Sequence, residues 1–320
     1  MAFMKERRQR PSRYFPWMFF YLALAGPALG WLGRWFWFFD LFSHFRVQQV
    51  GFLILSLPFL IWWKKNILVV LSVFIILIAG FPLLAYCPGL APSSEEPPVA
   101  HPFRVTYANV NVANLNYDAI VSVLLKDKPD VLVISEISAS LHEAMTPYLK
   151  EYLFQKVVPR SDCFGLGVFS RVPVKFMDVR FLGEPRLPSI RCVIALGAKE
   201  CVIWATHPTP PMGKKVWGWR NEQLKILLQE IEADPRPRIV VGDLNMAPWC
   251  SWFGMFQTAA GLKDSSQGKG IVPTWPFYLP ALLRIPLDHI LVSEDFFVIQ
   301  RDVFSLPGSD HRPLSVVLEI

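Results

Sequence analysis

The sequence contains few charged residues for its length of 320. Asp, Glu, Lys and Arg together make up 18%, whereas hydrophobic residues make up 52%. Chains that stay intrinsically disordered combine low hydrophobicity with high charge, so this composition excludes disorder. It is also more apolar than an ordinary soluble domain, in which about a quarter of the residues are charged. The composition therefore indicates that part of the chain lies in lipid.

Cysteine is scarce as well. The five cysteines are scattered and form no Cys-x-x-Cys pair, which argues against a disulfide scaffold, a zinc site and a thioredoxin-type redox motif. An odd number leaves at least one thiol free. Cys192 and Cys201 are close enough in sequence to be neighbours on a hairpin, but a disulfide also needs the right register and distance. Their spacing alone does not predict one.

The second part of the chain lacks a strong charge of either sign. The formal net charge is +6, which could mark a nucleic-acid binder. Residues 1–100 hold nine Lys/Arg and four Asp/Glu, a net charge of +5, and residues 101–320 hold 23 and 22, a net charge of +1. The basic excess lies in the apolar part, where it is typical of a membrane topology signal rather than of a DNA-binding surface.

Three long apolar runs occupy the first part: Phe15–Phe39, Val50–Trp63 and Ile67–Cys87. A membrane-spanning helix needs about 20 mostly apolar residues, so the first and third runs qualify. The middle run has only 14 residues, but it would span if the Trp-Trp-Lys-Lys sequence at 62–65 anchored its end. The alternative is two spans with a re-entrant or interfacial segment between them. We predict a membrane region over residues 1–88 with about three transmembrane helices.

The first run has a second interpretation. The Lys and Arg residues at positions 5–13 resemble the positive start of a secretory signal peptide. The run is longer than the apolar core of a signal peptide, carries many Trp and Phe residues, and is followed by further apolar runs. We therefore favour a retained anchor.

Lys and Arg also predict the orientation. They gather before the first run and at Lys64 and Lys65 after the second, and such segments stay cytoplasmic. Three spans would place the N-terminus inside and everything after Cys87 outside, as in a multi-pass protein of the cell (inner) membrane. Residues 89–102 are rich in Pro, Ser and Glu and are predicted to be a linker.

From Phe103 onward, short β-branched runs alternate with helical ones. Strands are predicted at 103–110, 131–135, 167–170, 174–181, 190–195, 201–206, 239–241, 290–292 and 315–318, and helices near 117–126, 138–151 and 219–233. No internal repeat is visible. Many strands with a few helices over residues 103–320 are typical of one α/β sandwich domain.

Polar side chains follow these strands where each one ends or begins. They are Asn109, Glu136, His207, Asp243, Asn245, Asp288, Asp310 and His311. Side chains at one rim of a packed scaffold can converge on one site. Carboxylates and amides are hard oxygen donors, which suit Mg²⁺ or Mn²⁺ rather than zinc. A hard divalent ion beside an Asp base and a histidine describes metal-assisted hydrolysis of a phosphate ester.

The order of these residues resembles the endonuclease/exonuclease/phosphatase superfamily with the DNase I-like fold. The motifs run through residues 103–320 in the family's order: YANV, PDVLVISE, GLGVFSR, THP, RNEQL, GDLN, PLDHILVS and SDHRPL. A single GDLN or SDH is a weak signal, whereas eight elements in order are a strong one. The details of GDLNMAPW, PTWP and GSDHRPL look like a membrane-anchored bacterial branch. The resemblance implies two packed mixed β-sheets flanked by helices, preceded here by the transmembrane helical region.

The resemblance also implies a role for each matching residue. Glu136 is expected to be the main Mg²⁺ ligand, with Asp310 and Asn109 completing the metal site. Asp243 is expected to activate the attacking water, with Asn245 holding it. Asp288 is expected to fix the tautomer of His311, whose other ring nitrogen faces the phosphate. His207 is expected to stabilise the phosphate or to protonate the leaving oxygen.

Two further residues are assigned to substrate binding. Asn111 stands where some nucleases of this superfamily carry an acid, so a second metal ligand is missing or supplied differently. Arg220 lies in a predicted helix and either contacts substrate or packs the helix; together with Lys214 and Lys215 it could form a local basic patch. His289 is expected to be structural, since its side chain points away from that of its neighbour Asp288.

These inferences predict a membrane-anchored, Mg²⁺-dependent phosphoester hydrolase of the phosphodiesterase or nuclease type. Its partners would be the lipid bilayer and a phosphate-ester substrate, which could be a nucleic acid, a phospholipid or a small phosphoester. The near-neutral domain weakens the nucleic-acid case, because such binding rests largely on Lys and Arg. The rival hypothesis is a non-catalytic, membrane-tethered binding module on the same fold.

Overall fold

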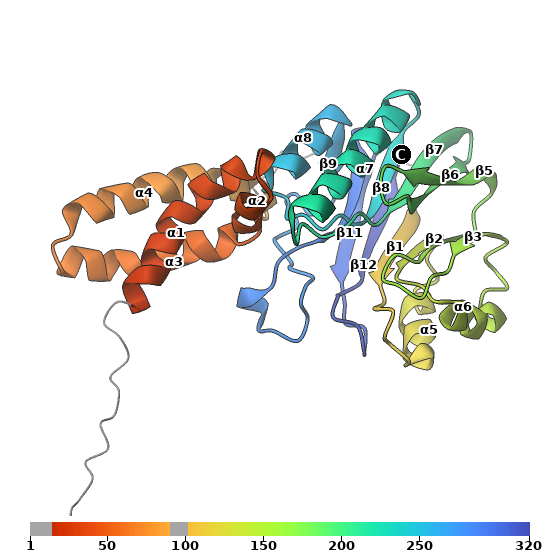
Figure 1. Ribbon diagram of the computed structural model, residues 1–320. Coiled ribbons are helices and arrows are strands. Elements are labelled where there is room, and N and C mark those ends of the chain that lie inside the picture. The colour runs from red at the N-terminus through yellow and green to blue at the C-terminus, as the bar shows by residue number, and fades with distance from the viewer. Residues whose placement is uncertain (1–14, 90–101) are drawn as a thin grey trace, which may run out of the picture.

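The computed structural model describes residues 15–89 and 102–320. They form an elongated helical part and a β-sandwich, which Figure 1 shows side by side. The basic cluster at 5–13, most of the predicted linker at 89–102, and His101 lie outside the described residues.

The sandwich consists of two mixed six-stranded sheets, in the orders β11-β12-β1-β2-β4-β3 and β5-β6-β7-β8-β10-β9. The strands are β1 (Phe103–Asn109), β2 (Val131–Ser135), β3 (Phe154–Val158), β4 (Leu166–Ser170), β5 (Val174–Leu182), β6 (Leu187–Leu196), β7 (Lys199–Thr206), β8 (Arg238–Asp243), β9 (Leu262–Asp264), β10 (Asp288–Ser293), β11 (Phe297–Val303) and β12 (Leu314–Glu319). In each sheet one central pair is parallel, β1 with β2 and β7 with β8. The other pairs are antiparallel.

Helices cover the two outer faces of the sandwich. They are α5 (Tyr117–Leu125), α6 (Ala139–Met145), α7 (Lys214–Glu232) and α8 (Ser251–Ala259), with single turns η3 (Thr146–Tyr148) and η4 (Ala281–Leu283). One apolar core fills the space between the sheets, a second lies under α5 and α6, and a third lies under α7 and α8. The predicted architecture of two packed mixed sheets flanked by helices is confirmed.

Most predicted elements are present, and the differences have local causes. The strand predicted at 131–135 has those bounds in the structure, but the helix predicted at 138–151 ends at Met145, two residues before Pro147, which cannot continue it. The strands β3, β9 and β11 and the helix α8 were not predicted. β3 and β11 are edge strands with half-buried residues, so they show little alternation. Cys192 and Cys201 lie on neighbouring strands, but in the register Cys192 is opposite Ile203 and Cys201 is opposite Ile194. Both thiols are free.

The helical part contains α1 (Phe15–Trp31), η1 (Leu32–Arg34), α2 (Trp37–Ser43), α3 (Arg46–Trp62), α4 (Asn66–Gly80) and η2 (Phe81–Tyr86). The prediction of one helix over Phe15–Phe39 is wrong, because α1 ends at Trp31 and α2 turns back beside it. Glycines permit this return: a Cβ on Gly30 would lie 3.0 Å from the Ser43 Cα, and one on Gly33 would lie 2.5 Å from the Asp40 Cα. The two segments pack where only glycine fits.

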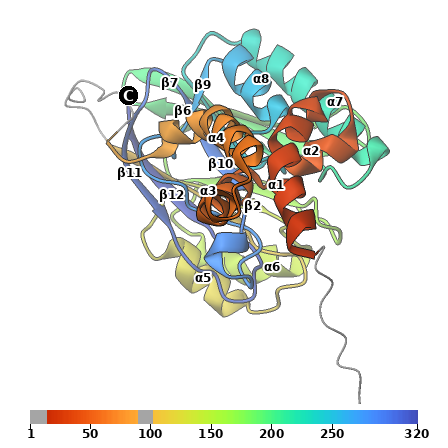
Figure 2. The ribbon, with the colours of Figure 1, turned by 90° about the vertical axis from the view of Figure 1, so that its left-hand side faces the viewer.

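Within the described residues, one helical segment, Asn66–Tyr86, is long and apolar enough to cross a membrane. α2 and α3 would make a second only if this pair, bent by 59°, formed one span. Figure 2, which views the molecule from the end of the helical part, shows α1, α3 and α4 side by side in front of the sandwich. Many of their large apolar side chains are exposed.

The two ends of the helical part differ. At the far end the rings of Trp17 and Trp63 lie 5.7 Å apart, so the start of α1 meets the turn between α3 and α4. At the near end the Trp249 indole donates to the His44 carbonyl, and the Gly270 backbone N–H donates to the Tyr86 carbonyl. The start of α1 and the Lys64–Lys65 turn therefore lie opposite the sandwich (Figure 1).

Candidate active site

All the predicted site residues except Arg220 lie at one rim of the sandwich, where strands of both sheets end. Asn109 is the last residue of β1 and Glu136 follows β2, while His207 follows β7 and Asp243 is the last residue of β8. The carboxyl ends of parallel strands meet at the same edge, which explains why these side chains converge. Asp288 begins β10 directly opposite Asp243 in the antiparallel register.

Close approach of two strand ends depends on a glycine. A Cβ on Gly242 would lie only 1.8 Å from the carbonyl oxygen of Thr206, so any larger residue before Asp243 would push β8 away from β7. Glycine in the GDLN motif thus brings Asp243 beside His207. Their closest atoms, Asp243 Oδ2 and His207 Nε2, lie 3.5 Å apart.

A cavity of about 570 Å³ opens at this rim. Six of the ten predicted site residues line it: Glu136, His207, Asp243, Asn245, Asp310 and His311. Asn109, Asn111 and Asp288 contact these residues without lining the cavity, and Arg220 lies behind it. The structure therefore brings nine of the predicted side chains to one place and sets one apart.

Asp243 lies at the centre of the cluster and is 2% exposed. Its backbone N–H donates to the Tyr107 hydroxyl at 2.8 Å, and its Oδ1 accepts the backbone N–H of Asn245 at 2.8 Å. Burial opposes ionisation, but the hydrogen bond from His207 and the charges of His311 and His207 outweigh it and lower the pKa of Asp243. The carboxylate is therefore ionised at neutral pH with Oδ2 turned to both histidines.

His311 and Asp288 form a buried pair. The His311 Nδ1 lies 2.9 and 3.1 Å from the two Asp288 oxygens, and its Nε2 lies 3.7 Å from Asp243 Oδ2. Burial favours the neutral ring, but the Asp288, Asp243 and Asp310 carboxylates outweigh it and raise the pKa of His311 to about 10. Asp288 thus fixes the ring with Nδ1 protonated and Nε2 directed at the cavity.

His207 completes the polar centre. Burial would lower the pKa of its ring, but the hydrogen bond and charge of Asp243 and the charge of Glu136 raise it. Its Nδ1 is buried and has no hydrogen-bond partner among the residues that the structure describes. The Phe164 ring lies 5.4 Å away and holds one side of the imidazole.

Glu136 is held in an unusual backbone conformation. Its φ is +64°, a region that costs non-glycine residues about 1–3 kcal/mol and is often found at functional sites. The backbone N–H donates to the Gly165 carbonyl at 2.7 Å. Its Oε1 accepts from Asn109 Nδ2 and its Oε2 from the Val112 backbone, both at 2.9 Å. These bonds fix the carboxylate at the cavity wall.

Asp310 also lines the cavity, and each of its carboxylate oxygens accepts a hydrogen bond. Its Oδ1 accepts from Asn111 Nδ2 and its Oδ2 from the Trp275 indole, both at 2.9 Å. Asn111 therefore positions an acid here. Trp275 lines the cavity and orients Asp310, a role that the sequence alone did not show.

The donor chemistry of the wall fits a hard divalent cation. Glu136 and Asp310 present carboxylate oxygens to the cavity, and Asn109 supports one of them. A tighter group also exists: Asp243, Asp288 and His311 each offer a ligand atom within 4.8 Å of the others. Asp288 does not line the cavity and both of its oxygens face the His311 ring. That group is better described as an ion-paired triad, whereas the Glu136 and Asp310 carboxylates line the cavity and could hold a metal.

Arg220 does not line the cavity and is not placed to contact a substrate there. It is fully buried on α7, and its Nη2 donates to Asp40 Oδ2 of α2 at 2.6 Å. Its Nη1 donates to the Asn245 carbonyl at 3.3 Å. Lys214 and Lys215 are exposed, so Arg220 does not join them in the basic patch proposed from the sequence. Of the two interpretations left open, the contacts of Arg220 favour packing of its helix.

The helical part also forms one wall of the cavity, which the sequence did not reveal. Leu41 of α2 and His44 and Phe45, between α2 and α3, line the cavity. One signal was present: Asp40 is the only acidic residue between Glu6 and Glu95. A lone acid in an apolar region suggests a buried partner.

The remaining aromatic and histidine residues serve packing. His289 lies outside the cavity, with Nδ1 3.1 Å from Asp264 Oδ2 and Nε2 2.9 Å from the Met246 carbonyl. Trp249 and Trp252 donate to backbone carbonyls of the helical part. The placement of His289 agrees with its expected structural role.

Comparisons with known proteins agree with the fold. The model of a family described as the endonuclease/exonuclease/phosphatase family matches residues 106–311. No curated protein matches the chain.

Solved structures with the DNase I-like fold resemble the sandwich. One is an endonuclease/exonuclease/phosphatase from Beutenbergia cavernae, with 20% identity over 68% of this chain and 72% of that one, and a TM-score of 0.56. The human Nocturnin catalytic domain with bound sulfate has 18% identity over 69% and 96%, and a TM-score of 0.57. The Neisseria 3′ phosphatase NExo bound to a product DNA hairpin has 18% identity over 68% and 100%, and a TM-score of 0.56.

Proposed function

This chain belongs to the endonuclease/exonuclease/phosphatase family, and on that premise we propose that it is a membrane-anchored, Mg²⁺-dependent phosphoester hydrolase. Members of this family typically cleave phosphoester bonds. One observation carries the proposal that this chain does so: Asp243, His207 and the Asp288–His311 pair meet in a single cavity whose wall also holds Glu136 and Asp310. A non-catalytic binding module would not need this complete set.

The polar centre suits attack of water on phosphorus. Asp243 is ionised and lines the cavity, so it can accept a proton from the attacking water. Asn245 lines the cavity next to it, and its backbone N–H bonds Asp243 Oδ1. His311 points its Nε2 into the same space, where it can donate to a phosphate oxygen. The charge that develops on the phosphate would then face donors that are already in position.

His207 is suited to the leaving group. Its raised pKa favours a protonated ring, which can donate to the phosphate or to the departing oxygen. Among these groups the Asp288 carboxylate hydrogen-bonds only to His311, so we assign Asp288 to positioning the His311 ring.

The metal would be held by Glu136 and Asp310, with Asn109 orienting the Glu136 carboxylate. When bound, Mg²⁺ or Mn²⁺ supplies Lewis-acid stabilisation of negative charge on the phosphate oxygens. Asn111 acts on this site through Asp310. Because residue 111 is an amide, it supplies no second carboxylate ligand.

The helical part is proposed to be the membrane anchor. Its exposed surface is rich in large apolar side chains, and the Lys64–Lys65 turn lies at the end far from the sandwich. We propose three spans, with the N-terminus in the cytoplasm and the catalytic domain outside it at the cell (inner) membrane. Reporter fusions after Cys87 test this: an extracytoplasmic enzyme reporter should be active, and activity of a cytoplasmic reporter there would refute the topology.

The activity is tested with the purified full-length chain and bis(4-nitrophenyl) phosphate as a generic phosphodiester. We expect release of nitrophenolate that stops with EDTA, returns with Mg²⁺, and is lost in Asp243→Asn. A folded chain that binds phosphate but releases no nitrophenolate under any of these conditions would support the non-catalytic alternative. The fold alone does not choose among nucleic acids, phospholipids and small phosphoesters.

A further inference from the structure

We propose that the phosphoester cleaved by this protein belongs to a membrane lipid, whose hydrocarbon chain lies along one face of α3. The inference rests on the proposed hydrolase function and adds the substrate class. It is carried by the shape and composition of two cavities and by the helix face that joins them.

The catalytic cavity is lined by both polar and apolar residues. The polar ones are the catalytic groups described above. The apolar ones include Leu41 and Phe45 from the helical part, Pro210–Met212 from the loop before α7, and Ile285 and Leu287. Met212 is 74% exposed. A hydrocarbon group attached to the phosphate would therefore meet apolar side chains directly beside the catalytic centre.

The same cavity is poorly suited to a nucleic acid. None of the described residues that line it is Lys or Arg. Binding of nucleic acids depends strongly on cationic contacts with the phosphate backbone. The exposed Lys214 and Lys215 lie at the start of α7 and do not line the cavity. The lining thus favours one phosphate joined to an apolar group over a chain of phosphates.

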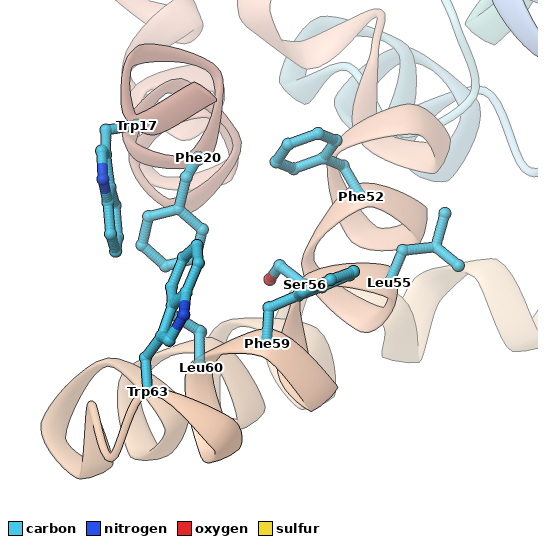
Figure 3. A pocket seen from close by; sticks show the side chains of 8 residues that line it. All are labelled: Trp17, Phe20, Phe52, Leu55, Ser56, Phe59, Leu60 and Trp63. Carbon is cyan, nitrogen blue, oxygen red and sulfur yellow. The ribbon is translucent and has the colours of Figure 1, made fainter. Parts of the chain in front are cut away.

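A second cavity of about 410 Å³ lies in the helical part, between α1 and α3. Figure 3 shows its lining: Phe20 extends from α1 toward Trp63, and Phe52 points from the facing helix toward α1. Apart from Ser56 its lining side chains are apolar or aromatic. Such a groove is suited to a hydrocarbon chain.

One face of α3 joins the two cavities. Phe45 precedes the helix and lines the catalytic cavity, whereas Phe52 and Phe59 line the second. A spacing of seven residues is close to two helical turns, so these three rings share one face. All three are substantially exposed. They form a row of aromatic side chains from the catalytic centre into the helical part, and we call this row the α3 track.

The length of the α3 track suits a lipid. Phe52 lies about 10 Å and Phe59 about 21 Å beyond Phe45, at a rise of about 1.5 Å per residue. Half of a bilayer's hydrocarbon core is about 15 Å thick. The chain of a lipid in one leaflet would therefore pass Phe52 and end before Phe59, with its phosphate at the catalytic centre.

The loop beside the cavity adds an apolar rim. Tyr278 and Leu282 are 73% and 75% exposed. The Gln48 side chain of α3 donates to the carbonyls of Leu282 and Arg284 at 3.2 and 2.8 Å, which holds this loop against the helix. Exposed aromatic and apolar residues next to a membrane helix are typical of contact with the lipid interface. This loop would thus lie at the lipid interface, next to residues Ile285 and Leu287 of the cavity lining.

The test compares two chromogenic diesters, methyl 4-nitrophenyl phosphate and dodecyl 4-nitrophenyl phosphate, with the full-length chain in detergent and Mg²⁺. In each case a water oxygen bonds to phosphorus and the bond to nitrophenolate breaks, leaving methyl or dodecyl phosphate. We expect kcat/KM to be at least about tenfold higher for the dodecyl ester, because apolar groups removed from water strengthen binding.

Variants separate the α3 track from general partition into detergent. Phe52→Ser should lower the dodecyl-to-methyl ratio at least about threefold, while Phe52→Leu, which stays apolar, should keep it. Phe74→Ser is the matched control. Phe74 lies on α4, about as many residues from the α3–α4 turn as Phe52 is on α3; it is 57% exposed and lines neither cavity. It should keep the wild-type ratio.

The outcomes distinguish the hydrolase function from the lipid substrate. EDTA-sensitive cleavage of the methyl ester with a ratio near one would overturn the lipid inference and leave the hydrolase intact. Equal ratios for Phe52→Ser and Phe74→Ser, or faster cleavage of a single-stranded oligonucleotide than of the dodecyl ester, would also overturn it. Absence of EDTA-sensitive cleavage of both esters would overturn the hydrolase function itself and the lipid inference with it.

Discussion

The ion pair between Asp40 and Arg220 connects the helical part to the catalytic domain, and Asp40→Ala tests its strength. Both side chains are fully buried, and Asp40 Oδ2 lies 2.6 Å from Arg220 Nη2. Removing one partner of a buried pair leaves an uncompensated charge, which costs about 3–5 kcal/mol. For a domain of this size each kcal/mol lowers Tm by about 2–4 °C, so we expect a loss of roughly 6–20 °C.

Thermal unfolding of the detergent-solubilised full chain, followed by near-ultraviolet circular dichroism, measures this loss. Glu232→Ala is the control: it removes an exposed acid from the same helix as Arg220 and should change stability by at most about 0.5 kcal/mol. The double variant Asp40→Leu/Arg220→Met should recover most of the stability, because it removes both charges. A loss in Asp40→Ala no larger than in Glu232→Ala would refute the buried pair.

The other predictions concern the polar centre. Asp243→Asn and His311→Ala should each lower kcat at least about a hundredfold, the lower end of typical acid–base contributions; activity within tenfold of wild type in either variant would remove that residue from the mechanism. Asp288→Asn should cause a milder loss, and Asp288→Asn/His311→Ala should be no slower than His311→Ala, because residues that act as a unit are non-additive; additive losses in steady-state rates would contradict the pairing. His289→Ala should lower Tm and have little effect on kcat, since it leaves buried Asp264 without its partner; a folded but inactive variant would show that the wrong histidine was assigned to packing.

Much of the fold was predictable because it depends on local sequence patterns. β2 is a short continuous apolar run rich in β-branched residues, and α7 carries buried apolar residues at helical spacing, so each matches a local sequence signal. The placement of Asp243, Asp288 and His311 followed from their motifs at strand ends. The edge strands β3 and β11 escaped detection because their residues are only partly buried and carry no clear alternation.

The parts that were missed depend on contacts between distant segments. Asp40 and Arg220 are 180 positions apart, and nothing near Arg220 in the sequence identifies its partner. The first apolar run was predicted as one helix, because its composition is uniform; the break at Trp31 depends on glycines that fit against α2. For the same reason the sequence did not show that Leu41 and Phe45 line the catalytic cavity.

The central claim is that a hard divalent ion held by Glu136 supports phosphoester cleavage in this cavity. The most direct test is the Mg²⁺ activation curve for cleavage of bis(4-nitrophenyl) phosphate, measured for the wild type and for Glu136→Gln. The substitution keeps the shape but removes the anionic ligand, so the Mg²⁺ concentration for half-maximal activity should rise at least about tenfold and the maximal rate should fall. An unchanged curve with an unchanged maximal rate would contradict the account.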